Sequence, residues 1–432
     1  MNHFINWKLR NLFYQIRHQG FLATTKILNQ RIHQKMIMHF TENRRHLVEK
    51  EYREIWGKLQ IPNDPTFRVL LVVFSFYELT GEIFQHGGAE RYTLELSQIV
   101  NQLGGRLEVY QCGNKNWHRK FMGIDFFGLA TGGFNTEALN QYFHEWVPQG
   151  RLTIYFQMIL STPRCHTPSI CVSHGVDWDA HWLQNQPHLY KQMINTVLYS
   201  TRNVSCIVSV DTNTINWLRA TDAMLAKKCI YVPNFVDTDA FYPLESPHEG
   251  FILLYPRRLS EARGFWLLAH IIPKLMAKYL NLQVHFCGIA EHLEEIEVGH
   301  LCKSYPNRVL WYDRTPDDMP EVYAQADIVV IPTCYSEGTS LSCLEAQASE
   351  RPVIASNVGG LTDLILHDFN GILIEPNEED LFRAIDRLLL DPNERIRLGK
   401  NGWLTSQYFS LSTWKERWRI LIKKILIDNL EI

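Results

Sequence analysis

From residue 67 onward, short apolar runs alternate along the chain with longer amphipathic stretches. The apolar runs have the length of buried strands, and the first series covers residues 69–76, 107–112, 152–156, 169–173 and 205–210. Stretches with helical periodicity separate these runs, for example residues 90–103 and 136–146. Because parallel strands are joined by crossovers that are usually helices, the alternation predicts a parallel sheet with helices on both faces.

A second series of the same kind begins at residue 251. Its apolar runs cover residues 251–255, 284–287, 309–312, 328–331, 353–355 and 372–374. A polar link with Pro243 and Pro247 joins the two series. We therefore predict two doubly wound, Rossmann-like α/β domains, residues 67–240 and 241–410, with a ligand-binding crevice between them. Residues 411–432 are predicted to form a C-terminal helix that packs back on the first domain.

The first 66 residues differ from the rest and are predicted to form a helical extension. Six Lys or Arg side chains and no acidic ones precede Glu42. Five apolar residues near its start fall on one helical stripe, namely Ile5, Leu9, Leu12, Phe13 and Ile16. A basic amphipathic helix can lie on an anionic membrane surface, but the same stripe could instead dock on the body of the protein. Both interpretations stay open.

Composition narrows the class of protein. The 432 residues include 43 Lys and Arg against 46 Asp and Glu, so there is no electrostatic reason to expect a nucleic-acid partner. No apolar run approaches the ~18–20 residues of a membrane-spanning helix. The nine cysteines form no Cys-x-x-Cys pair, which disfavours zinc ribbons and thiol redox motifs. We expect a cytoplasmic protein, whose membrane contact would be peripheral, on the inner face of the plasma membrane through residues 1–60.

The segment His86-Gly87-Gly88-Ala89-Glu90 lies between the first predicted strand and a helix. Glycine lets the backbone approach a ligand closely, and a helix N-terminus offers free N–H groups and partial positive charge. Gly87 and Gly88 are therefore a candidate phosphate cradle, although a tight turn explains the same pattern. The segment is neither a Walker loop nor G-x-G-x-x-G, so ordinary dinucleotide binding loses support.

Two glutamates eight residues apart flank a predicted helix start after the strand near residue 330. Glu337 lies in the loop and could accept hydrogen bonds from sugar hydroxyls. Glu345 lies on the helix and could bind a ribose diol. The backbone N–H groups of the small-residue run between them would face a phosphate; that run is Gly338, Thr339, Ser340 and Leu341.

Arginines follow the first strand of the second series. Arg257, Arg258 and Arg263 lie in the segment from residue 257 to Gly264. A diphosphate leaving group needs its developing charge neutralised, and a guanidinium can bind it with two parallel hydrogen bonds. The arginines should therefore contribute more to leaving-group stabilisation than a helix dipole does.

Taken in order, these motifs resemble the retaining GT-B glycosyltransferases of family 4. The resemblance covers roughly residues 68–410 and rests on the following motifs: Gly-Gly-x-Glu at 87–90, Tyr231-Val232-Pro233-Asn234-Phe235-Val236-Asp237 with Phe241-Tyr242-Pro243, the Arg-Leu…Arg-Gly segment, the two spaced glutamates, Asn357-Val358-Gly359-Gly360 and Asn370-Gly371. It implies that the glycine loop, Arg258 and Arg263 hold the diphosphate of a nucleotide sugar. It also implies that Glu337 contacts the donor sugar, that Glu345 contacts the ribose, and that His174 lies beside the donor sugar.

The chain departs from the family pattern at three places. Arg257 replaces the usual Gly, Arg263 replaces the usual Lys, and the segment at Gly288 lacks a second Gly. Two Asp-x-Asp matches, Asp177-Trp178-Asp179 and Asp237-Thr238-Asp239, could hold a divalent cation. Because cationic side chains already occupy the position of the metal, we expect no metal and no cofactor.

The resemblance implies transfer of a hexose from a nucleotide diphosphate sugar, first of all UDP-glucose, with retention of the anomeric configuration. The expected acceptor is a hydroxyl of a polysaccharide or of a lipid-linked oligosaccharide. Two alternatives remain: a GT-B-fold sugar-nucleotide epimerase, which needs no acceptor, and a catalytically silent protein that binds sugar nucleotides.

Overall fold

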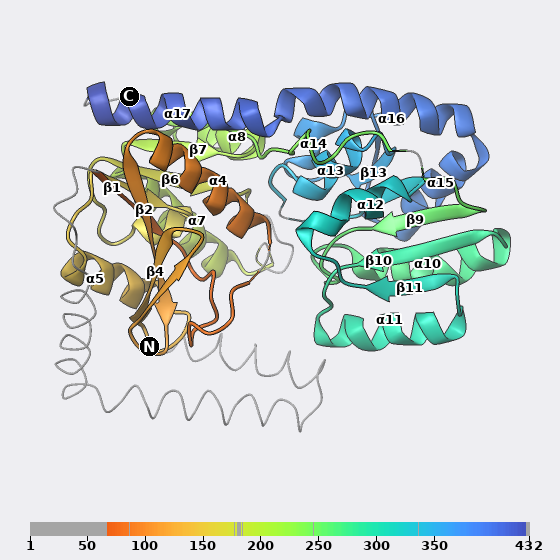
Figure 1. Ribbon diagram of the computed structural model, residues 1–432, viewed down its shortest axis with the longest axis horizontal. Coiled ribbons are helices and arrows are strands. Elements are labelled where there is room, and N and C mark those ends of the chain that lie inside the picture. Colours follow the sequence, from red (N-terminus) through yellow and green to blue (C-terminus); the bar gives the residue numbers. More distant parts are fainter. Residues whose placement is uncertain are drawn as a thin grey trace.

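The computed structural model describes residues 67–428 except 86, 177, 179–182, 184, 245 and 336. Within this range the chain forms two α/β domains that lie side by side (Figure 1). The predicted basic helices of the N-terminal extension lie outside the described residues. In the part of the chain that is described, no helix combines the length and the apolar composition needed to cross a bilayer.

The first domain is built on an eight-stranded sheet of order β3-β4-β2-β1-β5-β6-β7-β8. Its strands are β1 (Phe67–Val72), β2 (Gly105–Gly113), β3 (Trp117–Phe121), β4 (Ile124–Ala130), β5 (Leu152–Tyr155), β6 (Ser169–Ser173), β7 (Cys206–Ser209) and β8 (Cys229–Tyr231). All neighbours pair in parallel except β3 and β4, which form an antiparallel edge hairpin. The carboxyl ends of the parallel strands therefore share one edge of the sheet.

Helices cover both faces of this sheet. Helices α4 (Gly88–Gln102) and α17 (Leu411–Asp428) pack on one face. The other face is covered by α5 (Thr136–Trp146), η1 (Met158–Ser161), α7 (Pro187–Arg202), α8 (Thr212–Thr221) and α9 (Ala223–Ala226). Each helix buries an apolar stripe against the sheet, as a doubly wound fold requires.

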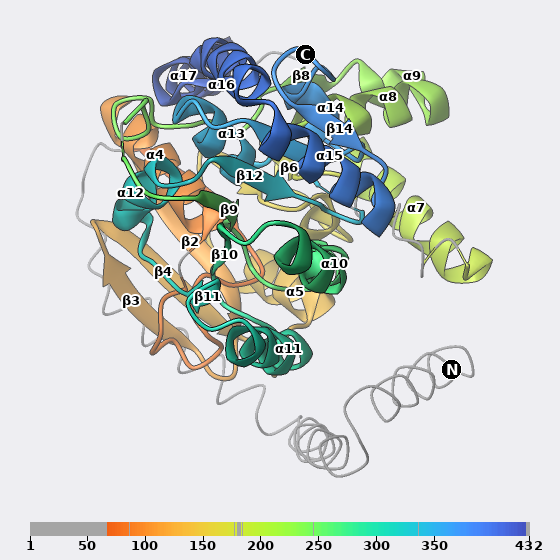
Figure 2. The ribbon, with the colours of Figure 1, turned by 90° about the vertical axis from the view of Figure 1, so that its right-hand side faces the viewer.

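The second domain has a six-stranded, fully parallel sheet of order β11-β10-β9-β12-β13-β14. The strands are β9 (Phe251–Tyr255), β10 (Leu282–Cys287), β11 (Val309–Tyr312), β12 (Ile328–Ile331), β13 (Val353–Ser356) and β14 (Ile372–Ile374). On one face lie α10 (Phe265–Lys278), α11 (His292–Ser304) and α15 (Glu378–Leu390) (Figure 2). On the other lie α12 (Met319–Ala324), α13 (Leu341–Ala348) and α14 (Leu361–Leu364). The strand order reverses between β9 and β12, and ligands of such folds bind outside the carboxyl ends of the strands at that point.

The C-terminal helices tie the two domains together. Helix α16 (Pro392–Ser406) belongs to the second domain, and after η4 (Gln407–Phe409) helix α17 crosses to the first domain (Figure 1). There the indole Nε1 of Trp418 donates to the hydroxyl of Tyr92 on α4 at 2.9 Å. The sequence-based prediction of two doubly wound domains is confirmed by this architecture.

Candidate functional site

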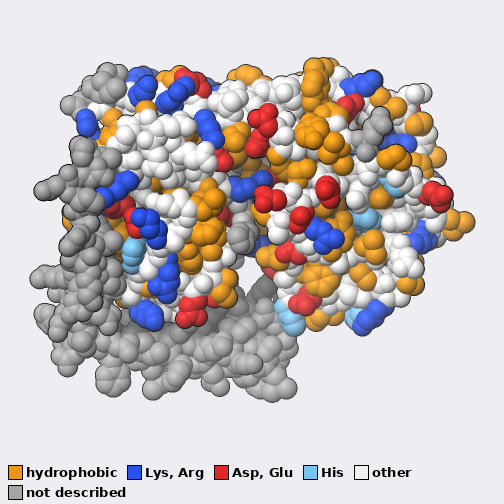
Figure 3. All heavy atoms as spheres, viewed as in Figure 1, with side chains coloured by type: hydrophobic (Ala, Val, Ile, Leu, Met, Phe, Trp, Pro, Cys, Tyr) orange, Lys and Arg blue, Asp and Glu red, His pale blue; other side chains and the backbone are white. Residues whose placement is uncertain are grey.

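The predicted site residues gather where the two domains meet, at the carboxyl ends of β9 and β12. On one face of the molecule, basic and acidic side chains flank this junction (Figure 3). The first turn of α4, from the first domain, lies against the first turn of α13, from the second. A Cβ atom added to Gly88 would lie 2.6 Å from the Cδ1 atom of Leu341. Glycine at this position therefore lets the two helix starts touch.

Glu337 is buried in the loop after β12 and is held by three donors. Its Oε2 atom accepts hydrogen bonds from Arg257 Nη2 at 2.7 Å, Arg263 Nη1 at 2.5 Å and Thr333 Oγ1 at 3.0 Å. Burial alone would raise the pKa of this carboxyl, but the two guanidiniums hold the pKa below its ordinary value. Glu337 is therefore a carboxylate at neutral pH. No hydrogen bond among the described residues involves its Oε1 atom.

Arg258 is the most exposed of the three arginines Arg257, Arg258 and Arg263. Among the described residues it makes no ion pair, although its charge acts on the nearby carboxyls of Glu90 and Glu291. The hydroxyl of Tyr255, the last residue of β9, donates to the backbone oxygens of Arg258 at 3.1 Å and Arg263 at 3.0 Å. The strand end thus shapes the loop, and Arg258 is the arginine that it presents to solvent.

From the sequence, Arg257 was expected to help neutralise a diphosphate and was also noted as a departure from the family pattern. Its side chain is 8% exposed and also donates to Thr333 Oγ1 at 2.6 Å. The guanidinium is thus a buried partner of Glu337. Sequence analysis did not assign this role, because the pairing spans 80 residues.

Glu345 lies on α13, and both of its carboxylate oxygens accept hydrogen bonds. Its Oε1 atom accepts from Arg91 Nη2 at 2.6 Å, and its Oε2 atom accepts from the hydroxyl of Tyr323 at 2.9 Å. Arg91 belongs to α4, so this ion pair joins the two domains. Neither partner was predicted from the sequence; the position of Arg91 directly after the Gly-Gly-x-Glu motif was the available signal.

The hydroxyls of Thr339 and Ser340 form hydrogen bonds within the protein. The hydroxyl of Thr339 donates to the backbone oxygen of Val210 and accepts from the backbone N–H of Asn234, both at 2.8 Å and both across the domain junction. The hydroxyl of Ser340 accepts from the backbone N–H of Cys343 at 3.4 Å and caps α13. What this segment offers a ligand is therefore the backbone N–H groups of the first helical turn.

The loop of Glu337 is packed closely from both domains. The backbone N–H of Gly360 donates to the Glu337 backbone oxygen at 2.7 Å. A Cβ atom on Gly338 would lie 2.5 Å from the backbone oxygen of His174. The chain segments that carry His174 and Glu337 are therefore neighbours in space, although 163 residues separate them in the sequence.

The ring of His174 lies among aromatic side chains, with centroids 4.3 Å from Phe156 and 5.7 Å from Tyr92. Burial lowers its pKa to about 4, so the ring is neutral at pH 7. It hydrogen-bonds to the backbone of Phe156, and among the described residues its buried Nε2 atom has no hydrogen-bond partner. An unpartnered buried nitrogen is costly, and a hydroxyl of a ligand would satisfy it.

Gly87 directly precedes α4, and no side-chain hydrogen bond among the described residues caps the start of this helix. The side chain of Glu90 lies against it, since a Cβ atom on Gly87 would be 2.8 Å from Glu90 Oε2. Burial raises the pKa of Glu90 to about 7, while its own backbone N–H and Arg258 act in the opposite direction. A carboxyl that titrates near neutrality therefore lies beside the glycine loop. His86 of the same motif is outside the described residues.

Of the two Asp-x-Asp matches, the structure describes the carboxylates of one. Asp177 and Asp179 lie outside the described residues. The carboxylate of Asp237 accepts from the backbone N–H of Asp239 at 3.0 Å, which is a local turn in the linker between the domains.

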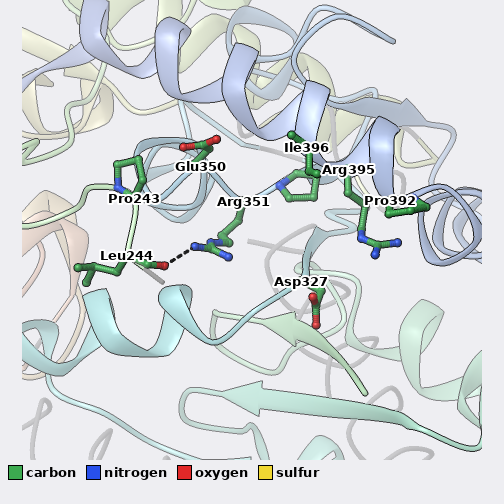
Figure 4. Close-up of a pocket in the computed structure, with 9 residues that line it drawn as sticks. Pro243, Leu244, Asp327, Glu350, Arg351, Pro392, Arg395 and Ile396 are labelled. Carbon is green, nitrogen blue, oxygen red and sulfur yellow. Dashed lines mark hydrogen bonds between the residues drawn. The ribbon is translucent and has the colours of Figure 1, made fainter. Parts of the chain in front are cut away.

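A cavity of about 480 Å³ lies away from these residues, beside the amino ends of β12 and β13 (Figure 4). The linker residues Pro243 and Leu244 line it, and Arg351 Nη2 donates to the backbone oxygen of Leu244 at 2.7 Å. Because α/β sheets bind their ligands at the carboxyl ends of the strands, we assign this cavity to linker anchoring.

Comparisons with known proteins find relatives of part of the chain. Residues 237–404 match the family model Glycosyl transferases group 1. The chain is 32% identical over 144 residues to an uncharacterized glycosyltransferase of Methanocaldococcus jannaschii, covering 32% of this chain and 36% of that protein. It is 29% identical over 175 residues to D-inositol 3-phosphate glycosyltransferase of Corynebacterium efficiens, covering 38% and 40%. The matched regions thus span well under half of these two relatives.

Solved structures show the same fold over most of the chain. Sucrose-phosphate synthase of Thermosynechococcus elongatus superposes with a TM-score of 0.68 at 19% identity, covering 84% of this chain and 100% of that one. Anabaena HepE in complex with UDP-glucose gives a TM-score of 0.63 at 17% identity, covering 83% and 100%. The protein therefore has the two-domain fold of GT-B glycosyltransferases, and its residues 237–404 match the glycosyl transferases group 1 family.

Proposed function

We propose that this protein is a glycosyltransferase that moves a hexose from a nucleotide diphosphate sugar to an acceptor hydroxyl. The observation that carries the proposal is the position of Arg258. It is an exposed guanidinium at the switch point of the second sheet, and the starts of α4 and α13 meet close by. One cation and two helix N-termini form the kind of environment that a diphosphate requires.

In this proposal Arg258, with Arg263 beside it, binds the diphosphate from the second domain. The backbone at Gly87 and Gly88 approaches it from the first domain. A well-aimed donor in an enzyme site contributes roughly 3–4 kcal/mol to the stability of a developing negative charge. A helix terminus contributes about 0.3–1 kcal/mol. Arg258 should therefore dominate stabilisation of the leaving group.

Glu337 and His174 would orient the donor sugar. The three donors on Glu337 share one oxygen, and the other can accept from a sugar hydroxyl. The unpartnered Nε2 of His174 supplies a second acceptor from the first domain. Two fixed acceptors on opposite sides of the junction support a site that positions a polyol.

The anomeric configuration would be retained by front-face displacement, as the resemblance to family 4 implies. The bond between the anomeric carbon and the leaving phosphate oxygen breaks, and the acceptor oxygen bonds to the same face of that carbon. The acceptor proton passes to the departing phosphate oxygen. Glu337 is a poor candidate for a covalent nucleophile, because Arg257 and Arg263 already neutralise its charge. The reaction would need no metal.

UDP-glucose is the first donor to test, and a polysaccharide or lipid-linked oligosaccharide is the proposed acceptor. The Anabaena HepE structure contains UDP-glucose, whereas a Mycobacterium tuberculosis relative, 26% identical over 216 residues, is named as GDP-mannose-dependent. Donor screens should therefore include both bases.

The lipid-linked acceptor is motivated by the basic N-terminal sequence, which would bring the protein to the inner face of the plasma membrane. The full chain should sediment with anionic vesicles. Replacing Lys8, Arg10 and Arg17 by Ala should weaken this binding, because each basic side chain near such a surface contributes about 1 kcal/mol. Equal sedimentation of both proteins would contradict the membrane role.

The function is tested by incubating the full chain with UDP, GDP and ADP sugars in EDTA, with and without a mixture of glycan acceptors. A transferase gives a new glycosidic bond only with an acceptor, and NMR of the product reports the anomer. Arg258→Ala should lower the rate on the order of 10²–10³-fold, whereas the exposed control Arg383→Ala should not. An epimerised sugar formed without acceptor would favour the epimerase, and donor binding without any turnover would favour the silent binder.

A further inference from the structure

The ion pair between Arg91 and Glu345 occupies the place proposed for the donor ribose. Arg91 Nη2 lies 2.6 Å from Glu345 Oε1, and the side chains are 31% and 5% exposed. The Tyr323 hydroxyl holds the other oxygen of Glu345. Both carboxylate oxygens therefore already have a donor. Each carboxylate oxygen could accept a further hydrogen bond, but the Glu345 side chain is 5% exposed, so a ribose diol could reach it only if one of the two donors moves aside.

Arg91 is the donor that can leave. Tyr323 is fully buried, whereas the Arg91 side chain is partly exposed and carries a long, flexible stem. The Tyr323 hydroxyl is also within hydrogen-bonding distance of the Ser342 backbone oxygen at 3.3 Å, which keeps the ring near α13.

The position of Arg91 on α4 places its side chain near a second possible binding place, the glycine loop. Its backbone N–H donates to the backbone oxygen of Gly87 at 3.2 Å, so the two residues are one helical turn apart. Residues three and four apart share one helix face, and side chains on a helix lean toward its N-terminus. The Arg91 side chain is therefore on the face of the glycine loop and leans toward it.

We propose that Arg91 is a donor-site residue that exchanges partners. In the empty protein it pairs with Glu345. When the donor binds, Arg91 leaves Glu345, the ribose hydroxyls donate to that carboxylate, and the Arg91 guanidinium binds the diphosphate at the glycine loop. The inference rests on the proposed function and adds to it a binding residue from the first domain. Because the pair joins the two domains, the exchange also replaces a protein contact across the junction by the donor itself.

The proposal predicts opposite effects of one substitution on two probes. Arg91→Ala removes the competitor of the ribose, so the nucleoside alone should bind more tightly, by about threefold or more. The same substitution removes a phosphate ligand, so the nucleoside diphosphate should bind about tenfold more weakly, which is ~1.4 kcal/mol. A residue that only supports the fold would change both affinities in the same direction.

The test is calorimetric titration of the full chain with uridine and UDP, or with the guanine or adenine pair if that base binds. Arg91→Lys, which keeps the charge, should lie between the wild type and Arg91→Ala for the diphosphate. Lys415→Ala is the matched control, because it breaks the 2.5 Å ion pair with Glu95 of the same helix. It should leave both affinities unchanged.

Shifts of the two affinities in the same direction, or no shift in either, would overturn the role of Arg91 while leaving the proposed function intact. If the wild type bound none of the three nucleoside diphosphates, the proposed function would fall, and this inference with it.

Discussion

Two carboxyl groups of the site, Glu337 and Glu90, are both buried yet differ in charge. Glu337 has two guanidiniums at hydrogen-bonding distance, and they outweigh the cost of burial. Among the described groups, the backbone N–H of Glu90 and the charge of Arg258 lower its pKa, but burial outweighs them and the pKa rises to about 7. At the scale of single residues, the partners of a buried carboxyl therefore decide its charge.

Arg257→Ala tests the pairing of Glu337. Removing one member of a buried ion pair typically costs about 3–5 kcal/mol, and we expect the lower end because Arg263 remains. The lowered pKa of Glu337 means that its contribution is present above pH 4.5 and is lost as the pH falls through its folded value. The stability deficit of Arg257→Ala should thus be largest at neutral pH and shrink below pH 4.5.

Thermal unfolding of both proteins from pH 3 to pH 8 provides the measurement. Arg383→Ala, which breaks an exposed pair with Glu379, is the control and should cost less than about 0.5 kcal/mol. A deficit for Arg257→Ala as small as that of the control would contradict the assigned role.

Glu90→Gln tests the raised pKa of Glu90. The folded value of about 7 lies above the ordinary 4.5, so the wild type loses stability as the pH rises from 4.5 to about 7. Gln cannot ionise and should lack this loss. Relative to the wild type, the variant should gain up to roughly 3 kcal/mol between pH 4.5 and pH 8, measured from unfolding midpoints. Glu379→Gln, at an exposed position, is the control, and a flat difference for Glu90→Gln would show that burial does not govern its charge.

At the scale of elements, α17 holds α4 in place, and α4 carries the glycine loop, Glu90 and Arg91. Trp414 and Trp418 of α17 are almost fully buried against the first domain. Trp418→Ala should cost about 3–5 kcal/mol, the usual range for removing a buried aromatic side chain. Ile420→Ala on the exposed face of the same helix should change the stability by less than about 0.5 kcal/mol. Equal midpoints in thermal unfolding would show that α17 contributes little.

The elements that the sequence pattern predicted are those with continuous apolar runs, because strands buried on both faces leave that signal. The hairpin of β3 and β4 was not among them. Strand β3 is an edge strand of the sequence WHRKF, half exposed, and its turn places Met122 and Gly123 at positive φ angles of 47° and 81°. Such a turn usually contains Asn or Asp before Gly, and Met gives no comparable signal.

Site residues were predictable where a motif places them at the end of a strand or the start of a helix, as for Arg258, Glu337 and Glu345. Their partners were not, because pairing across the domains is a long-range property. Arg91 and Glu345 are 254 residues apart, and Thr212 and Asp363, which also pair across the junction, are 151 apart. Sequence spacing contains no information on such contacts without the relative position of the two sheets.

At the scale of the whole molecule, the central claim is that the junction between the domains is a donor site centred on Arg258. Thermal-shift and calorimetric titrations with UDP-glucose, GDP-mannose and ADP-glucose in EDTA test it most directly, on the wild type and on Arg258→Ala. A ligand at 100 times its Kd adds about 2.7 kcal/mol to stability, which is readily measured. We predict that one nucleotide class stabilises the wild type without metal and that Arg258→Ala loses this effect. Stabilisation by none of the three, or equal stabilisation of both proteins, would contradict the claim.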